Sequence, residues 1–159
     1  ILFEENIMSQ ILACQEDIVL IVDNTIQYHA PESNKVQDFV ISKNKHQSTR
    51  RKINFDCENI ISKIGSNLKP ETATHEFIGL AKFSKNGAEQ LLQTYEDCVK
   101  NHSGTLQEAA NINQFKFTDL IQEMIDRGYV ANFLEIHKGW LEIHSSEDIK
   151  LANHFLSNS

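Results

Sequence analysis

The chain has 159 residues, with 15 basic and 22 acidic side chains, and its formal net charge of −7 disfavours a nucleic acid or an anionic membrane surface as the main partner. Hydrophobic residues make up 40% of the chain and charged residues 23%, which excludes collagen-like, disordered and disulfide-scaffold classes. No apolar run approaches the roughly 20 residues that span a bilayer. The three cysteines are widely separated and are predicted to be reduced thiols of a cytoplasmic protein.

The first residues in chain order predict a helix followed by a buried strand. Apolar side chains at helical spacing indicate a helix over 4–15. Residues 18–22 are all apolar and mostly β-branched, which a central strand covered on both faces requires. This order is typical of α/β domains, so we expect a mixed, mostly parallel, Rossmann-like open sheet flanked by helices. The apolar triplet 1–3 resembles the end of a strand, and we therefore expect the chain to be a fragment of a longer protein.

The remaining elements follow from the same patterns. Strands are predicted at 36–42, 59–64, 75–84, 129–136 and 140–144, and helices at 85–102 and 117–125, with a last helix that begins after Ser145. Ser84 is a candidate N-cap for the helix that begins at Lys85, and Ser145 with Asp148 forms a capping-box pattern.

The segment Gly139–His144 is the strongest candidate for a site. In a strand, alternate side chains share a face, so Trp140, Glu142 and His144 point to one side. An aromatic ring, a carboxylate and an imidazole would then stand in a row before a helix N-terminus, a place that favours anions. The alternative is a half-exposed edge strand in which Trp140 is a surface anchor.

Other candidate binding residues lie at the ends of the predicted strands. Asp23 and Asn24 follow the buried strand, and ligands in open α/β sheets collect outside the carboxyl ends of strands. A turn-forming Asp-Asn pair explains the same residues equally well. Glu76 enters an apolar strand, where a carboxylate needs a partner or a ligand. A salt bridge at the strand end is the alternative for this residue.

Two histidines and two glutamates could in principle approach one another across a hairpin. They are His137, His144, Glu135 and Glu142. The chain has no HxxxH or HExxH spacing, so dispersed surface or core histidines explain the pattern better than a zinc site. Glycine-rich phosphate loops of the GxGxxG and GxxxxGK[ST] types are also missing from the sequence.

Two segments, 75–88 and 139–152, resemble the later part of nucleotidyltransferase domains. They are most similar to the domains joined to phosphoenolpyruvate mutase in phosphonate biosynthesis, which are akin to phosphocholine cytidylyltransferases and sugar-phosphate nucleotidyltransferases. The opening residues 1–6 and the segment 16–23 fit the middle of that family. The specific elements are Glu-Phe-Ile-Gly-Leu, from Glu76, and Trp-Leu-Glu-Ile, from Trp140.

The resemblance implies nucleotidyl transfer from a nucleoside triphosphate, CTP by similarity, to a phosphonate or phosphate-ester acceptor such as aminoethylphosphonate. It implies Mg²⁺, with Glu142 on a metal-binding carboxylate. His144 stands where the family commonly has a second acid, and a neutral imidazole is a poor ligand for Mg²⁺. Glu76 and Trp140 would contact the acceptor, because a carboxylate and an aromatic face suit a cationic amine.

The resemblance therefore predicts that residues 1–159 are the acceptor-binding, C-terminal portion of a nucleotidyltransferase domain whose nucleotide-binding portion is absent. We expect no catalytic residue in this chain and no activity from it alone. The substrate-binding candidates are Asp23, Asn24, Glu76, Trp140 and His144. The alternative is a non-catalytic α/β module that binds a ligand or packs against another domain. Neither a nucleic-acid nor a membrane partner is expected, and a truncated sheet with an exposed edge predicts self-association.

Overall fold

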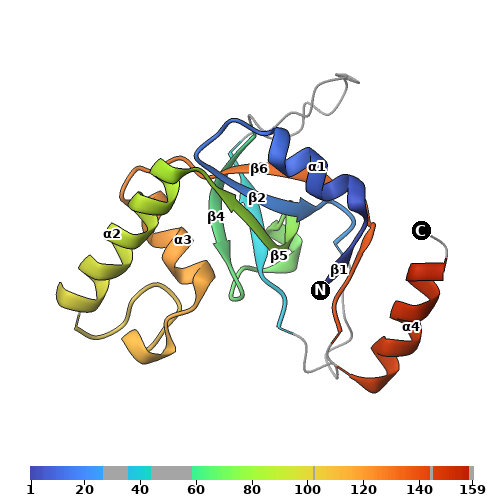
Figure 1. Cartoon of the computed structure of the whole chain (residues 1–159). Helices are drawn as coiled ribbons and strands as arrows, with labels where there is room; N and C mark the ends of the chain where they lie inside the picture. Colours follow the sequence, from blue (N-terminus) through green and yellow to red (C-terminus); the bar gives the residue numbers. More distant parts are fainter. Residues whose placement is uncertain (27–35, 44–58, 102, 144, 158–159) are drawn as a thin grey trace.

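The computed structural model describes residues 1–26, 36–43, 59–101, 103–143 and 145–157 (Figure 1). The elements in chain order are β1 (Leu2–Phe3), α1 (Glu5–Ala13), β2 (Ile18–Asp23), β3 (Phe39–Ser42), β4 (Asn59–Gly65), β5 (His75–Phe83), α2 (Lys85–Asn101), α3 (Phe117–Asp126), β6 (Asn132–Ile136), β7 (Trp140–Leu141) and α4 (Ser146–Ser157), with 3₁₀ turns at Pro70–Thr72 and Ile112–Gln114. The three predicted helices before residue 130 and the buried strand at 18–22 are confirmed to within two residues at each end.

The main sheet is a closed barrel, which shows that the expected open, mostly parallel Rossmann-like sheet is wrong. Its strand order is β2-β5-β3-β4-β6, and β6 returns to β2. Only the pairing of β2 with β6 is parallel; the other four pairings are antiparallel. The ring closes through a short ladder in which Asn59 pairs with Phe133 and Ile60 with Asn132. Closure removes the free edges of this sheet, so the exposed main-sheet edge that predicted self-association is not found among the described strands.

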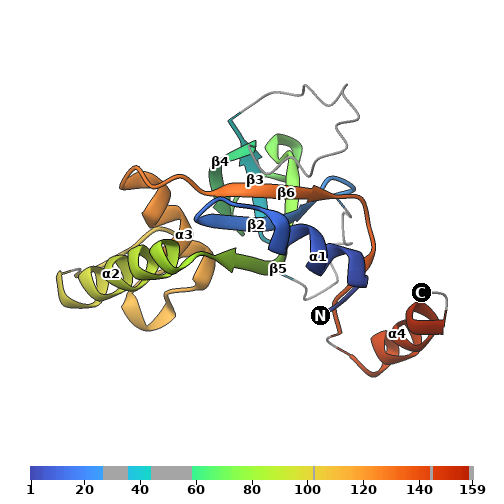
Figure 2. The same cartoon turned by 45° about the horizontal axis from the view of Figure 1, so that its top comes forward.

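Two hydrophobic clusters lie on opposite faces of β2. The inner cluster draws on all five barrel strands and on α3, and it includes Ile18, Leu20, Val22, Val40, Ile61, Phe77, Phe133, Ile121 and Met124. The outer cluster lies between α1 and the faces of β2, β5 and β6, and it includes Ile7, Ile11, Val19, Ile21, Ile78, Leu134 and Ile136. Every residue of β2 is buried, as a strand between two packed layers requires. Figure 2 shows α1 running across this outer face.

A glycine in the middle of β5 gives the strand its bend. The register between β2 and β5 shifts between Leu20, opposite Ala81, and Val22, opposite Phe77, so β5 carries two extra residues at this point. Gly79 lies within the bulge with a φ of 82°, a conformation that side chains with a Cβ rarely adopt. Bulges sharpen local twist and bend the strand that carries them. β5 pairs with β2 along one edge, from Phe83 to Glu76, and with β3 along the other edge, at His75 and Glu76.

The helix caps follow the predicted pattern. The Ser84 hydroxyl accepts a hydrogen bond from the Gly87 backbone N–H (3.1 Å) and donates to Asp17, which anchors the start of α2. At α4, Ser145 N–H donates to the Asp148 carboxylate (2.9 Å), and Asp148 N–H donates to the Ser145 hydroxyl (3.2 Å), so the capping box is confirmed. Both views show α4 set apart from the barrel strands, at the C-terminal end of the chain (Figures 1 and 2).

The structure also describes the state of two cysteines and the length and polarity of the helices. Cys14, which follows α1, is disulfide-bonded, so the prediction that all three cysteines are reduced is wrong for this residue. Cys98 on α2 is a free, buried thiol. Among the helices that the structure describes, none is both long enough and apolar enough to cross a membrane.

Candidate functional site

Three of the predicted site residues meet on the outer face, at the end of β2. Asp23 pairs with Glu76 across the β2–β5 ladder, so their side chains lie on the same face as neighbours. The Trp140 indole Nε1–H donates to the Asp23 carboxylate (2.7 Å), and Trp140 packs against the outer cluster. These three residues come from β2, β5 and β7, which are far apart in the sequence.

Asp23 is a buried carboxylate surrounded by donors. One oxygen accepts from the Thr25 backbone N–H (2.8 Å), from the Thr25 hydroxyl (2.7 Å) and, more weakly, from the Lys138 N–H (3.4 Å). The other oxygen accepts the Trp140 indole. Burial alone would raise the pKa of Asp23, but these hydrogen bonds outweigh it, and the pKa lies below its ordinary value. We call Asp23 with Thr25, Lys138 N–H and Trp140 the Asp23 clamp.

Glu76 is also buried, at 5% exposure, and accepts a hydrogen bond from the Gln37 side-chain amide (3.0 Å). Gln37 comes just before β3, so Glu76 links β5 to the start of that strand. A carboxylate at this depth needs such donors, as the sequence predicted. Asp23 is therefore the residue that the other two share on the outer face: Glu76 is its cross-strand neighbour, and the Trp140 indole is its hydrogen-bond donor.

Glu142 and His144, the remaining residues of the predicted row, lie beyond the end of β7. Glu142 is half-buried. Strand β1 pairs antiparallel with β7, with Leu2 opposite Leu141 and Phe3 opposite Trp140, and continuing this register by one residue places Ile1 opposite Glu142. His144 lies outside the described residues, so its predicted contact with a substrate stays a prediction.

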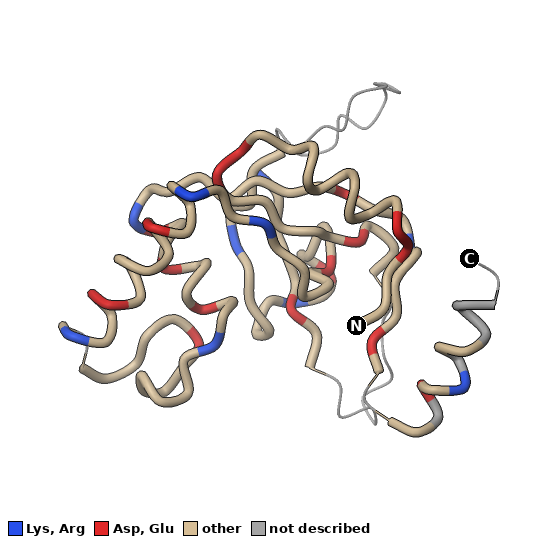
Figure 3. Tube along the Cα trace, in the orientation of Figure 1, with Lys and Arg blue, Asp and Glu red and all other residues tan. Residues whose placement is uncertain are grey.

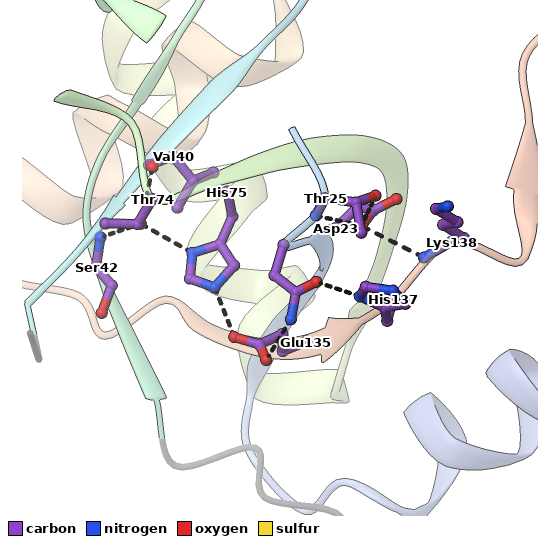
Figure 4. Close-up of polar contacts among 10 residues, drawn as sticks. Asp23, Thr25, Val40, Ser42, Thr74, His75, Glu135, His137 and Lys138 are labelled. Carbon is purple, nitrogen blue, oxygen red and sulfur yellow. Dashed lines mark hydrogen bonds and ion pairs between the residues drawn. The ribbon is translucent and has the colours of Figure 1, made fainter. Parts of the chain in front are cut away.

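A second polar group lies on the inner face at the same end of β2. Asn24 donates from its side-chain amide to Glu135 (2.8 Å), and its oxygen accepts from His137 Nδ1 (2.9 Å). Glu135 also contacts His75 Nε2 at 2.7 Å, and His75 Nδ1 lies 2.8 Å from the Thr74 hydroxyl. Figure 4 shows this run of contacts, which we call the His75 relay: Thr74, His75, Glu135, Asn24 and His137.

The sequence reasoning missed most of the His75 relay. Asn24 was a predicted substrate contact, but its side chain meets Glu135 and His137 instead of joining the Asp23 clamp. Glu135 and His137 were considered only for zinc. Among the residues with described placement, no group of three His, Cys, Asp or Glu is arranged to hold a metal ion. The available signal was Glu135 itself, a charged residue within the otherwise apolar segment of β6.

The donor set for Mg²⁺ is small in the described part of the chain. Mg²⁺ prefers six oxygen ligands in octahedral geometry and accepts one or two carboxylates with waters. Glu142 lies at the end of β7, and both oxygens of Asp23 accept hydrogen bonds. One carboxylate with waters fits Mg²⁺ only weakly, so Mg²⁺ would need a further ligand.

Charge is unevenly distributed around this end of the barrel. The part of the trace near the N-terminus, where β1 and β7 pair, shows mainly acidic positions (Figure 3). An acidic surface attracts cations and repels polyanions. The Asp23 clamp with Glu76 therefore suits a ligand that carries a positive charge.

Comparisons with known proteins add no family assignment: no protein-family model matches the chain, and no curated protein or solved structure is significantly similar to it.

Proposed function

We propose that this chain is the acceptor-binding part of a nucleotidyltransferase that transfers a nucleotidyl group from a nucleoside triphosphate, CTP by resemblance, to a small phosphonate or phosphate ester. An amine-bearing acceptor such as aminoethylphosphonate is the proposed substrate class, and a phosphoenolpyruvate mutase-type protein is the proposed parent. The proposal rests on the local segments around Glu76 and Trp140.

The observation that carries the proposal is the meeting of Asp23, Glu76 and Trp140 on the outer face. The resemblance implicates Glu76 and Trp140 separately, and they lie 64 positions apart (140 − 76) in the sequence. The structure has both beside Asp23, through the β2–β5 pairing and the indole hydrogen bond. An aromatic face next to carboxylates attracts an ammonium group electrostatically. The acceptor would bind through its amine, which leaves its phosphonate oxygens directed away from the acidic pair.

The proposed role of this chain is to bind and orient the acceptor. Mg²⁺, when bound, would neutralise charge on the triphosphate as the nucleotidyl group is transferred. Orientation alone contributes strongly to such a reaction, because positioning the acceptor oxygen converts a bimolecular encounter into an effectively unimolecular step. Trp140 would set the acceptor's orientation, since its indole is fixed by the bond to Asp23.

A fluorescence titration tests this role directly, because Trp140 is the only tryptophan in the chain. Aminoethylphosphonate and phosphocholine should change its emission saturably, and methylphosphonate, which lacks the amine, should bind more weakly. Glu76→Gln should weaken binding of the amine-bearing ligands about tenfold or more, which corresponds to about 1.4 kcal/mol. Glu89→Gln, on the exposed face of α2, is the matched control and should bind like the wild type.

Two results would contradict the proposal. One is an emission that none of these ligands changes while circular dichroism shows folded protein. The other is binding that methylphosphonate matches, because the acidic pair would then have no role in recognition. A separate assay with CTP, Mg²⁺ and aminoethylphosphonate should yield no product from this chain, and release of pyrophosphate would show that the expectation of inactivity is wrong.

The second candidate function is a non-catalytic module. The saturation of Asp23 favours it, since a carboxylate that accepts four hydrogen bonds within the protein is suited to holding strands together. In that case the ligands above leave the Trp140 emission unchanged, and Asp23 variants affect folding only.

A further inference from the structure

His75 occupies a buried position at which both ring nitrogens have polar partners. The side chain is at the start of β5 with 6% exposure, and its ring packs against Phe133 with a centroid distance of 4.8 Å. Nε2 lies 2.7 Å from a Glu135 carboxylate oxygen, and Nδ1 lies 2.8 Å from the Thr74 hydroxyl. A carboxylate only accepts, so Nε2 carries a hydrogen whenever Glu135 is ionised.

The Thr74 hydroxyl can donate its hydrogen to either of two acceptors. It accepts from the Ser42 N–H (3.0 Å), and it lies 3.0 Å from the Val40 carbonyl oxygen as well as 2.8 Å from His75 Nδ1. Its single hydrogen can point to the carbonyl or to the ring. Val40 carbonyl oxygen also accepts the Thr74 backbone N–H (2.9 Å), so it keeps a partner in either case.

These contacts fit two protonation states of His75 equally well. In the neutral ring, Nε2–H donates to Glu135 and Nδ1 accepts the Thr74 hydroxyl. In the imidazolium, Nδ1–H donates to the Thr74 oxygen, and the hydroxyl hydrogen turns to Val40. Only one hydroxyl rotates between the states, and every polar atom stays satisfied. The change in charge is large, because the bond to Glu135 becomes a charge-assisted pair.

Glu135 connects His75 to Asn24, the residue that follows β2. Its other oxygen accepts the Asn24 amide (2.8 Å), which fixes the Asn24 orientation because a carboxylate cannot face the amide oxygen. Asn24 also donates its backbone N–H to Ile136 O (3.1 Å) and accepts from His137. Asn24 directly follows Asp23, so the His75 relay and the Asp23 clamp share one peptide unit.

We propose that the His75 relay is a proton-operated latch: protonation of His75 fixes the Glu135 carboxylate in position, which keeps Asn24, and with it the Asp23 clamp and Trp140, in place, and deprotonation releases them. The latch does not depend on the proposed function, because it acts on the position of Trp140 with no ligand present.

The groups around His75 support this assignment. Glu135 is the charged partner from β6. Asp23 and Glu76 lie on the opposite face of the sheet, and β3 carries no titratable side chain. The one titratable side chain of β4 is Lys63, which is exposed. His137 reaches His75 only through Asn24 and Glu135. Hydrogen bonds hold the pKa of Asp23 below its ordinary value, so Asp23 stays ionised where histidines titrate, about pH 5 to 8.

The test follows Trp140 emission from pH 5 to 8 without ligand. The wild type should show a transition in this range, and His75→Gln should abolish it. His144→Gln is the matched control, because this histidine follows Trp140 closely in sequence and does not belong to the relay. The control should keep the transition. Circular dichroism on each variant shows whether it is folded.

Two variants that retain His75 keep the test decisive if His75→Gln does not fold. Glu135→Gln removes the charged partner of the imidazolium, and Thr74→Val leaves its Nδ1–H without an acceptor. Both disfavour the protonated ring, so both should move the transition to lower pH. The latch is wrong if the wild-type emission has no transition, if His75→Gln retains it, if a control variant abolishes it, or if both Glu135→Gln and Thr74→Val leave its position unchanged.

Discussion

Replacing Asp23 by Asn tests how strongly the clamp holds the barrel end together. One oxygen of Asp23 accepts both Thr25 donors, and the other accepts the Trp140 indole. Asn has a single carbonyl oxygen, which would stay with Thr25 and leave its NH₂ group facing the indole N–H. A charge-assisted hydrogen bond is worth about 1.5–3 kcal/mol, and we expect Asp23→Asn to lower the free energy of unfolding by about 2–4 kcal/mol.

A double-mutant cycle separates the energy of the Trp140–Asp23 hydrogen bond from the other effects of the two substitutions on stability. Trp140→Phe removes the same bond from the other side and should cost about 1.5–3 kcal/mol. In the double variant the Asn NH₂ group no longer faces an indole N–H, so the costs should not add, and the coupling energy should be about 1.5–3 kcal/mol. Urea unfolding followed by far-ultraviolet circular dichroism measures all four proteins, since Trp140→Phe removes the fluorophore. Costs that add to within about 0.5 kcal/mol would refute the clamp.

Three further predictions concern charge and packing. Burial raises the pKa of Asp38, so its ionised form lowers the stability of the fold, and this loss is recovered as pH falls through this pKa. Asp38→Asn should therefore raise the melting temperature at pH 7 by a few degrees, with a smaller gain in acid. A melting temperature at pH 7 below that of the wild type would contradict this. A Cβ at Gly87 would lie 2.2 Å from the Asp17 carbonyl oxygen, so Gly87→Ala should cost about 1–3 kcal/mol in urea unfolding despite the better helix propensity of Ala. The pKa of Asp23 is lower in the folded protein than its value of about 3.9 in the unfolded chain, so Asp23 stabilises the fold above about pH 3.9. This stabilisation is lost as pH falls through the pKa of the folded state. As pH falls below about 4, the free energy of unfolding of Asp23→Asn should therefore decrease less than that of the wild type.

The positions of helices and strands could be predicted because their signals are local. Five consecutive apolar residues in 18–22 identify β2 wherever the rest of the chain lies, and the structure buries all of them. The predicted strand at 140–144 is wrong in its length, because β7 ends at Leu141 although the alternating sequence pattern continues to His144. Alternation specifies a face, but a strand also needs a partner, and β1 provides only two paired positions.

The closed barrel could not be predicted from the same signals. Closure depends on antiparallel pairing of β3 with β5 and of β4 with β6, between residues far apart in the sequence. A buried apolar strand suits a parallel open sheet and a small barrel alike, since both have packed layers on each face. Gly79 was the available local clue, because a glycine inside a strand pattern often marks a bulge.

The candidate site was predictable in part. The rule that ligands collect beyond strand ends drew attention to Asp23, and β2 and β6 do run parallel and end together. Glu76 was singled out as a charge in an apolar strand, and the β2–β5 register brings it to Asp23. The bond between Asp23 and Trp140 depends on the turn after β6, for which the sequence carries only Lys138 and Gly139, both with positive φ.

Strand alternation at the end of β2 gives the site two connected halves. Asp23 points to the outer face, while the next residue, Asn24, joins the inner network, so a single peptide unit separates the clamp from the His75 relay. Coupling between two sites is reciprocal in free energy. If protonation of His75 tightens the clamp for a ligand by a given factor, that ligand must favour the proton on His75 by the same factor. A ligand bound at the Asp23 clamp should therefore move the Trp140 transition to higher pH, and a ligand that binds equally at both ends of the pH range should leave it in place.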